Sequence, residues 1–176
     1  MLRLSDVKIR EARLEDLADI LVIYNQGIED RMATLETDMK NQDYIQKWFA
    51  EHQGRHAVLV AETDQKVVGF ASLNPYSHRC AYQGVADLSI YIHRDFRGHG
   101  IGTALLSTLE GLARDNDFYK IVLFTFPFNL NGQKLYRKLG YREVGIFKNQ
   151  GILDGKTIDV MAMEKLLSDM DSCPVS

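Results

Sequence analysis

A short loop rich in glycine and basic side chains is the part of this sequence best suited to chemistry. An apolar strand, Val85–His93, is predicted before it, and the loop itself, Arg94–Gly100, carries three basic residues, Arg94, Arg97 and His99. A helix is predicted to begin near Gly100, because apolar residues then recur at helical spacing. The first amides of a helix have no internal partners and the helix dipole is positive there, which favours anions. The segment Arg97–Gly102 is therefore predicted to hold a phosphate chain.

Three phosphate-binding patterns can be compared with this loop. A Walker loop requires Lys and then Ser or Thr after its last glycine, whereas Gly102 is followed by Thr103 and Ala104. A dinucleotide fingerprint requires Gly-x-Gly-x-x-Gly, and the glycines here are separated by single residues. The third pattern, Arg/Gln-x-x-Gly-x-Gly/Ala, is matched by Arg97, Gly100 and Gly102 and resembles the acyl-CoA pyrophosphate loop of the GCN5-related N-acetyltransferases. The six residues alone also leave open an ordinary glycine turn before a helix.

An acidic side chain in the preceding strand is the second candidate for chemistry. Side chains alternate along a strand, so one face is wholly apolar and the other carries Asp87, Ser89 and Tyr91. An acid within an otherwise buried strand is costly unless it is paired or hydrated. Asp87 therefore either pairs with a structural Arg or faces a wet cleft.

Length and composition are typical of one globular domain. Of the 176 residues, 45% are hydrophobic and 26% are charged, and we expect a single domain over residues 1–167 with a flexible tail over 168–176. The formal net charge of −3 gives no indication of a nucleic-acid partner. Neither a membrane-length apolar run nor a secretory leader is recognisable, so we expect no membrane partner and a cytoplasmic location. Cys80 and Cys173 have no metal-type spacing, and we expect no metal and no disulfide framework.

Hydrophobic periodicity predicts strands and helices along the whole chain. The expected strands lie at residues 7–10, 57–61, 67–75, 85–93, 120–126, 141–147 and 155–166, with the last two separated by residues 149–155. The expected helices lie at residues 14–29, 42–51, 129–139 and from about 100 onward. The irregular connection over residues 27–40, which contains Glu29 and Thr34, either forms a wall of the substrate pocket or is a plain surface loop.

The order of these elements resembles the fold of the GCN5-related N-acetyltransferase (GNAT) superfamily over nearly the whole chain. This resemblance implies an α+β fold of three layers, with a central mixed, mostly antiparallel sheet of about seven strands flanked by about four helices. Within the superfamily the sequence looks closest to the phosphinothricin acetyltransferase group. The matching stretches are residues 9–12 with 16–17, 23–25, 79–82, 89–93, the Arg97 loop, 135–141, and 153–156 with 159–160.

The resemblance assigns roles to individual residues. The backbone of Ile90, Tyr91 and Ile92 should pair with the pantetheine arm of acetyl-CoA, and Asn129 should meet the same arm from the following helix. The pyrophosphate should be cradled by Arg97, Gly98, His99, Gly100, Ile101, Gly102 and Thr103. Substrate contacts are expected from Arg79, Tyr82, Glu29 and Thr34. Acetyl-CoA is the expected cosubstrate and a small-molecule amine is the expected acceptor. The resemblance also implies a homodimer.

Two residues are expected to carry the chemistry, and both depart from the pattern of the group. Asp87 stands where the group usually has Glu, and we expect it to take a proton from the substrate amine, directly or through a water. Tyr136 stands where the group often has His, and it matches the proton donor to the leaving thiolate in many other superfamily members. Helix packing is the alternative role for Tyr136.

The leading interpretation is an acyl-CoA-dependent N-acetyltransferase that acts by direct attack on a small amino-acid-like substrate. The resemblance implies substrates of the phosphinothricin, methionine sulfoximine or methionine sulfone type, and Arg79 could pair with their anionic group. An acetyltransferase for a peptide N-terminus, a polyamine or an aminoglycoside is the first alternative. A non-catalytic acyl-CoA-binding module is the second, and the positions of Asp87 and Tyr136 argue against it.

Overall fold

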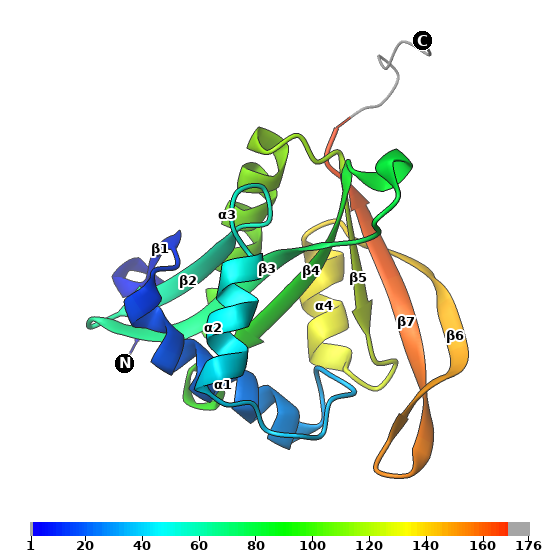
Figure 1. The fold of residues 1–176 in the computed structure, drawn as a ribbon, viewed down its shortest axis with the longest axis horizontal. Coiled ribbons are helices and arrows are strands. Elements are labelled where there is room, and N and C mark those ends of the chain that lie inside the picture. Colours follow the sequence, from blue (N-terminus) through cyan, green and yellow to red (C-terminus); the bar gives the residue numbers. More distant parts are fainter. Residues whose placement is uncertain (1, 169–176) are drawn as a thin grey trace.

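The computed structural model describes residues 2–168, which form a seven-stranded sheet covered by helices on both faces (Figure 1). The strand order is β1-β2-β3-β4-β5-β7-β6. Neighbouring strands run antiparallel except for β4 and β5, which run parallel. The predicted fold class, a mixed and mostly antiparallel sheet flanked by four helices, is therefore confirmed.

The helices and strands follow the hydrophobic pattern closely. The strands are β1 Lys8–Glu11, β2 Val58–Thr63, β3 Lys66–Pro75, β4 Val85–Ile92, β5 Lys120–Thr125, β6 Arg142–Leu153 and β7 Lys156–Leu166. The α-helices are α1 Leu17–Asp30, α2 Gln42–Glu51, α3 Ile101–Asp115 and α4 Leu130–Lys138. The predicted start of the first helix at Leu14 coincides with a short 3-10 helix, Leu14–Asp16, that leads directly into α1.

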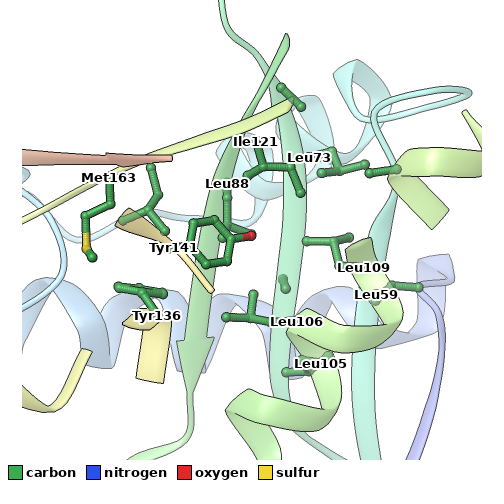
Figure 2. Packing of buried hydrophobic residues seen from close by; sticks show 14 of the residues in the cluster. Leu59, Leu73, Leu88, Leu105, Leu106, Leu109, Ile121, Tyr136, Tyr141 and Met163 are labelled. Carbon is green, nitrogen blue, oxygen red and sulfur yellow. The ribbon is translucent and has the colours of Figure 1, made fainter. Parts of the chain in front are cut away.

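Alternation of side chains along the strands divides the core between the two faces of the sheet. On one face, α1 and α2 pack against a cluster that includes Val58, Val60 and Phe70. On the other, α3 and α4 cover a larger cluster, in which Leu105, Leu106 and Leu109 of α3 face the sheet (Figure 2). Each fully buried leucine contributes about 1.5–3 kcal/mol of transfer free energy. β4 lies between these two layers at the centre of the sheet.

The central strand β4 is paired unequally on its two sides. Its antiparallel ladder with β3 extends from Ala86, opposite Pro75, to Ile92, opposite Gly69. Its parallel ladder with β5 covers only the three pairs from Val85↔Lys120 to Asp87↔Val122. Beyond Asp87 the two strands diverge, with α4 beside the gap in the view of Figure 1. This divergence leaves an open edge on β4.

The prediction of a loop over residues 149–155 was wrong. β6 continues to Leu153, which pairs with Lys156 of β7, so the two strands form one long hairpin. Its turn consists of Asp154 and Gly155, which both have positive φ values, 51° and 77°, as two-residue hairpin turns require. The register shifts between Phe147 and Gly151, which interrupts the alternation that would have revealed a continuous strand.

Two further predictions concern the extent of the chain. The predicted tail over residues 168–176 lies, apart from Ser168, outside the described residues. The single domain over residues 1–167 remains a prediction. None of the helices within residues 2–168 combines the length and the apolar character needed to cross a membrane.

Candidate active site

A cleft of about 620 Å³ opens where β4 and β5 separate. It is bounded by the open edge of β4, the start of α3, the exposed side of α4 and the end of α1. The backbone N–H and C=O groups of an open edge need partners, and an extended ligand can supply them as an added strand does. Ten of the residues predicted to bind the cosubstrate line this cleft: Ile90, Tyr91, Ile92, Arg97, Gly98, Gly100, Ile101, Gly102, Thr103 and Asn129.

The glycine loop has the backbone geometry of an anion site. Gly98 and Gly100 have φ values of +78° and +82°, in the left-handed region that residues with a side chain rarely adopt. Gly100 is the N-cap of α3, and the first turn of this helix, from Ile101 to Thr103, lines the cleft. The unpaired amides of such a turn bind phosphate groups.

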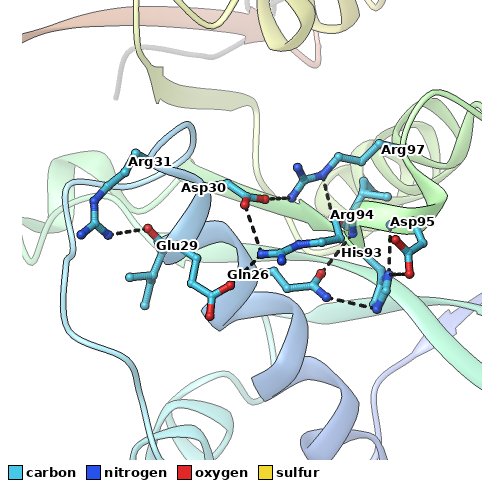
Figure 3. Close-up of polar contacts among 10 residues, drawn as sticks. Gln26, Glu29, Asp30, Arg31, His93, Arg94, Asp95 and Arg97 are labelled. Carbon is cyan, nitrogen blue, oxygen red and sulfur yellow. Dashed lines mark hydrogen bonds and ion pairs between the residues drawn. The ribbon is translucent and has the colours of Figure 1, made fainter.

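The end of α1 holds the two arginines of the loop in place. Nη2 of Arg97 lies 2.7 Å from Oδ2 of Asp30, and Nε of Arg97 donates to the carbonyl oxygen of Ile92 at 3.2 Å. Arg94 donates to Glu29 at 2.7 Å and to Asp30 at 3.1 Å. Figure 3 shows Asp30 between the two guanidinium groups. The acidic end of α1 therefore fixes Arg97 at the wall of the cleft.

The start of α4 is anchored to the end of β5. Asn129 is the N-cap of α4: its Oδ1 accepts a hydrogen bond from the amide of Gly132 at 3.1 Å, and its Nδ2 donates to Oγ1 of Thr125 at 3.2 Å. The cap satisfies one of the free amides of α4. Because Asn129 is held from both sides, it presents a fixed polar wall to the cleft.

Tyr136 lines the same cleft from the next turns of α4. Its side chain is buried, and its ring lies 6.0 Å from that of Tyr141, centroid to centroid. Burial raises the pKa of Tyr136 to about 12, so the hydroxyl keeps its proton at neutral pH. The residue therefore packs in the core and also reaches the cleft.

Asp87 lines a second cleft of about 550 Å³, together with Arg79 and Tyr82. Its Oδ2 accepts a hydrogen bond from Nδ2 of Asn74 at 3.1 Å. Burial raises the pKa of Asp87 to about 6, against the lowering effect of hydrogen bonds from Asn74 and the amide of Leu88. Of the two explanations offered for this buried acid, the geometry supports the cleft.

The two clefts meet the same strand at neighbouring positions. Asp87 belongs to one cleft and Tyr91, on the same face of β4, to the other. Four residues of a strand span about 13 Å. A base in the second cleft and an extended ligand along the first can therefore meet within the length of one small substrate.

Three of the predicted site residues lie outside the lining of both clefts. Glu29 accepts a hydrogen bond from Arg94, and Oγ1 of Thr34 accepts one from the amide of Glu36 at 3.1 Å. Nδ1 of His99 lies 2.9 Å from the carbonyl oxygen of Arg97, so its ring folds back on the loop. The contacts of these three residues within the described part of the chain are with the protein itself.

Sequence reasoning missed several residues that the structure brings to the site. Asn74 lies opposite Asp87 in the register of β3 and β4, and its hydrogen bond to the carboxylate depends on that register. Ser72 and Asn74 alternate along β3 and so share a face, which was a usable signal. Phe96, Asn131, Gly132 and Leu135 line the first cleft, and Tyr76 and Phe124 line the second.

Comparisons of the sequence with protein-family models and with known proteins find acetyltransferases. The model of the acetyltransferase (GNAT) family matches residues 17–141. YwnH of Bacillus subtilis, described as a candidate phosphinothricin acetyltransferase, is 32% identical over 161 residues, which cover 91% of this chain and 99% of YwnH. The L-methionine sulfoximine/L-methionine sulfone acetyltransferase of Pseudomonas aeruginosa is 29% identical over 168 residues, which cover 94% and 98% of the two chains.

A solved structure extends the comparison to a bound ligand. The crystal structure of a GNAT superfamily phosphinothricin acetyltransferase from Sinorhizobium meliloti in complex with AcCoA matches with a TM-score of 0.87 and 28% identity. The match covers 93% of this chain and 89% of that chain. Acetyl-CoA is thus bound by a protein of the same fold.

The loop assignment predicts a specific loss of binding. Gly100→Val should weaken acetyl-CoA binding about fivefold or more, because a branched residue is strained by about 1–3 kcal/mol at a positive φ and the free loop would relax to another conformation; 1.4 kcal/mol is tenfold in affinity. Gly111→Val is the matched control within α3, since a Cβ at Gly111 meets no atom within 4 Å. Isothermal titration calorimetry measures both. Unchanged affinity in Gly100→Val would contradict the loop assignment.

Proposed function

The chain belongs to the acetyltransferase (GNAT) family and is an acyl-CoA-dependent N-acetyltransferase, and we propose that it acetylates the amino group of a small amino-acid-like substrate from acetyl-CoA. The observation that carries the substrate class is the second cleft, in which a carboxylate, Asp87, and a guanidinium, Arg79, line one cavity. An amino acid carries an ammonium and a carboxylate, which complement these two charges. Phosphinothricin, methionine sulfoximine and methionine sulfone are amino-acid-like compounds of this class.

The first cleft is the proposed binding site for acetyl-CoA. The open edge of β4 from Ile90 to Ile92 would pair with the extended arm, and the first turn of α3 would receive the pyrophosphate beside Arg97. The volume of about 620 Å³ and the glycine conformations at the loop support this fit. Acetyl-CoA would supply an activated acyl thioester there.

Asp87 is the proposed general base. An alkylammonium is mostly protonated at neutral pH, as Lys is with its pKa of about 10.4, and must lose a proton before it can attack. With a pKa raised to about 6 by burial, Asp87 is ionised at neutral pH and is a stronger base than an exposed aspartate. It would take the proton directly or through a water.

Two further groups would complete the reaction. A backbone amide of β4 near Ile90 would stabilise the negative charge that develops on the acyl oxygen. Tyr136, whose hydroxyl keeps its proton because burial raises its pKa to about 12, would donate a proton to the departing thiolate. The absence of a required metal, the homodimer and the cytoplasmic location stay predictions from the sequence.

Asp87→Asn should lower kcat/KM about 100-fold or more, the scale of general acid–base catalysis, with little change in acetyl-CoA affinity. The ionised carboxylate is the active form, so kcat/KM of the unmodified enzyme should rise through about pH 6 and then level off. Thiol release measured across pH tests both statements. Asp115→Asn at the exposed end of α3 is the control. An unchanged profile in Asp87→Asn would remove Asp87 from the mechanism.

Tyr136→Phe should lower kcat by less than about 100-fold, since one proton donor is lost while the ring still packs. Tyr141→Phe makes the same change on the ring that contacts it and should leave kcat intact. The measurements are kcat at saturating substrate and the thermal melting temperature of both variants. A change confined to the melting temperature of Tyr136→Phe would show that its role is packing.

Arg79→Gln should raise KM for an amino-acid substrate about tenfold or more, because a charge-assisted hydrogen bond contributes about 1.5–3 kcal/mol. The corresponding amino-acid amide, which lacks the carboxylate, should show little difference between variant and unmodified enzyme. Arg13→Gln, at an exposed arginine, is the control variant.

A substrate panel tests the proposed class itself. Thiol release would be measured with phosphinothricin, methionine sulfoximine, methionine sulfone, a peptide with a free N-terminus, a polyamine and an aminoglycoside. We expect the three amino-acid analogues to give the highest kcat/KM. Preference for the peptide or for a polycation would overturn the proposed class, and no turnover with any amine would favour a binding module.

A further inference from the structure

A hydrogen-bonded chain of polar side chains extends from Asp87 to His52. The proposed reaction does not use the residues beyond Asp87. Asn74 of β3 is the centre of this hydrogen-bonded chain and sits opposite Asp87 in the strand register. Its Nδ2 donates to Oδ2 of Asp87 at 3.1 Å and to Oγ of Ser89 at 2.9 Å. Its Oδ1 accepts from Oγ of Ser72 at 2.9 Å and lies 2.7 Å from Nε2 of His52. Both donor hydrogens and both acceptor positions of the amide are therefore in use.

The contacts of His52 determine where its protons must be. Nδ1 lies 2.7 Å from the carbonyl oxygen of Trp48, and a carbonyl oxygen only accepts, so Nδ1 carries a hydrogen. Nε2 faces Oδ1 of Asn74, a second acceptor, so Nε2 carries a hydrogen as well. A histidine with hydrogens on both nitrogens is an imidazolium cation. In the orientation of the amide that donates to Asp87, Asn74 therefore makes a hydrogen bond with His52 only if that ring is positively charged.

The surroundings of His52 suit a cation. The residue is the C-cap of α2, at the end where the helix dipole is negative and favours positive charge. Its ring lies 4.6 Å from that of Trp48, centroid to centroid, where an aromatic face attracts a cation. The charge is therefore stabilised from two directions besides Asn74.

The amide of Asn74 links the charge of His52 to that of Asp87. A neutral His52 with Nε2 unprotonated needs a donor, so the amide would have to rotate and turn its Nδ2 toward the ring. Its Oδ1 would then face the carboxyl group of Asp87, and this contact is favourable only if that group is protonated. A neutral His52 beside an ionised Asp87 is the one combination that leaves two acceptors in contact in either orientation.

We propose that His52 is a positioning residue for Asp87: through Asn74 its positive charge holds Asp87 in the ionised, base-competent form. The proposal rests on the proposed function, in which Asp87 is the general base. His52 makes no contact with Asp87 itself and acts through the amide between them. Proton uptake by Asp87 during turnover leaves the amide in place, because a protonated carboxyl group still offers its carbonyl oxygen to Nδ2.

Other ionisable groups surround this chain from each packed element. Arg79 and Tyr82 share the cleft with Asp87, and Tyr91 lies on the same strand, where Asp87 contributes to raising its pKa. Near His52, burial together with Arg55 and His52 lowers the pKa of His56. These groups remain in place when His52 alone is replaced, so a change in the pH profile reports on His52.

His52→Gln separates the charge from the hydrogen bond, since glutamine can donate to Oδ1 of Asn74 but is neutral. We expect the acidic limb of the pH profile of kcat/KM to shift to higher pH by roughly half a pH unit or more, because a positive charge is lost near the carboxylate of Asp87. At pH 6 this is a loss of about twofold or more in kcat/KM, which disappears well above the limb. His56→Gln, four residues further along the chain, is the matched control and should leave the limb unchanged.

A measurement on the unmodified protein keeps the proposal falsifiable even if His52→Gln folds poorly. Nitrogen-15 NMR of the histidine rings should show hydrogens on both nitrogens of His52 at pH 7, and in Asp87→Asn the second hydrogen should be lost at a lower pH. This readout needs no turnover, so it separates failure of the linkage from failure of the proposed function. A neutral His52 ring at pH 7, or a limb that does not move in a folded His52→Gln protein, would overturn the proposal.

Discussion

The site depends on the early end of the β4–β5 ladder. A parallel ladder that continued beyond Asp87 would satisfy the backbone of β4 from both sides and leave no room for an extended ligand. Because β3 pairs with β4 as far as Ile92, β4 remains part of the sheet after the ladder with β5 has ended. The same few residues therefore form part of the core sheet and present an open edge to a ligand, with the glycine loop and the start of α3 directly after them.

The position of Asp87 follows from the same constraint. It belongs to the last pair of the β4–β5 ladder, where the strand passes from the closed part of the sheet to the open part. A residue earlier in the strand would be enclosed, and its carboxylate would be neutralised by desolvation. A residue later in the strand would lie in the first cleft, beside the proposed cosubstrate. At the fork, an acid is desolvated enough for the proposed role of general base and still lines the second cleft.

Much of this arrangement is local and was predictable for that reason. Alternation in Val85–His93 identified the acid, and Gly98, Gly100 and Arg97 identified the start of α3, because each signal lies within a few consecutive residues. The polar side chains around Asp87 were not predictable in the same way, since Asn74 reaches Asp87 through the cross-strand register, and His52, which contacts Asn74, comes from the end of α2. The β6 strand was cut short because its irregular register around Asn149 hides the period of two that marks a strand.

The polar residues on the α2 side of β4 complete the physical picture. A lone acid in a desolvated strand titrates toward the neutral form, and an acid paired directly with arginine becomes too weak a base. An amide between the acid and a distant cation avoids both extremes, because it donates one fixed hydrogen bond to the carboxylate and transmits only part of the cation's effect. Ser72 and Ser89 occupy the remaining hydrogen-bonding positions of Asn74. In either orientation, the hydrogen bonds of the amide therefore depend on the charges of His52 and Asp87. If Asp87 is the general base, the geometry of Asn74, His52, Ser72 and Ser89 would offset burial, which by itself opposes ionisation, and would set the basicity of Asp87 at the point where the sheet opens.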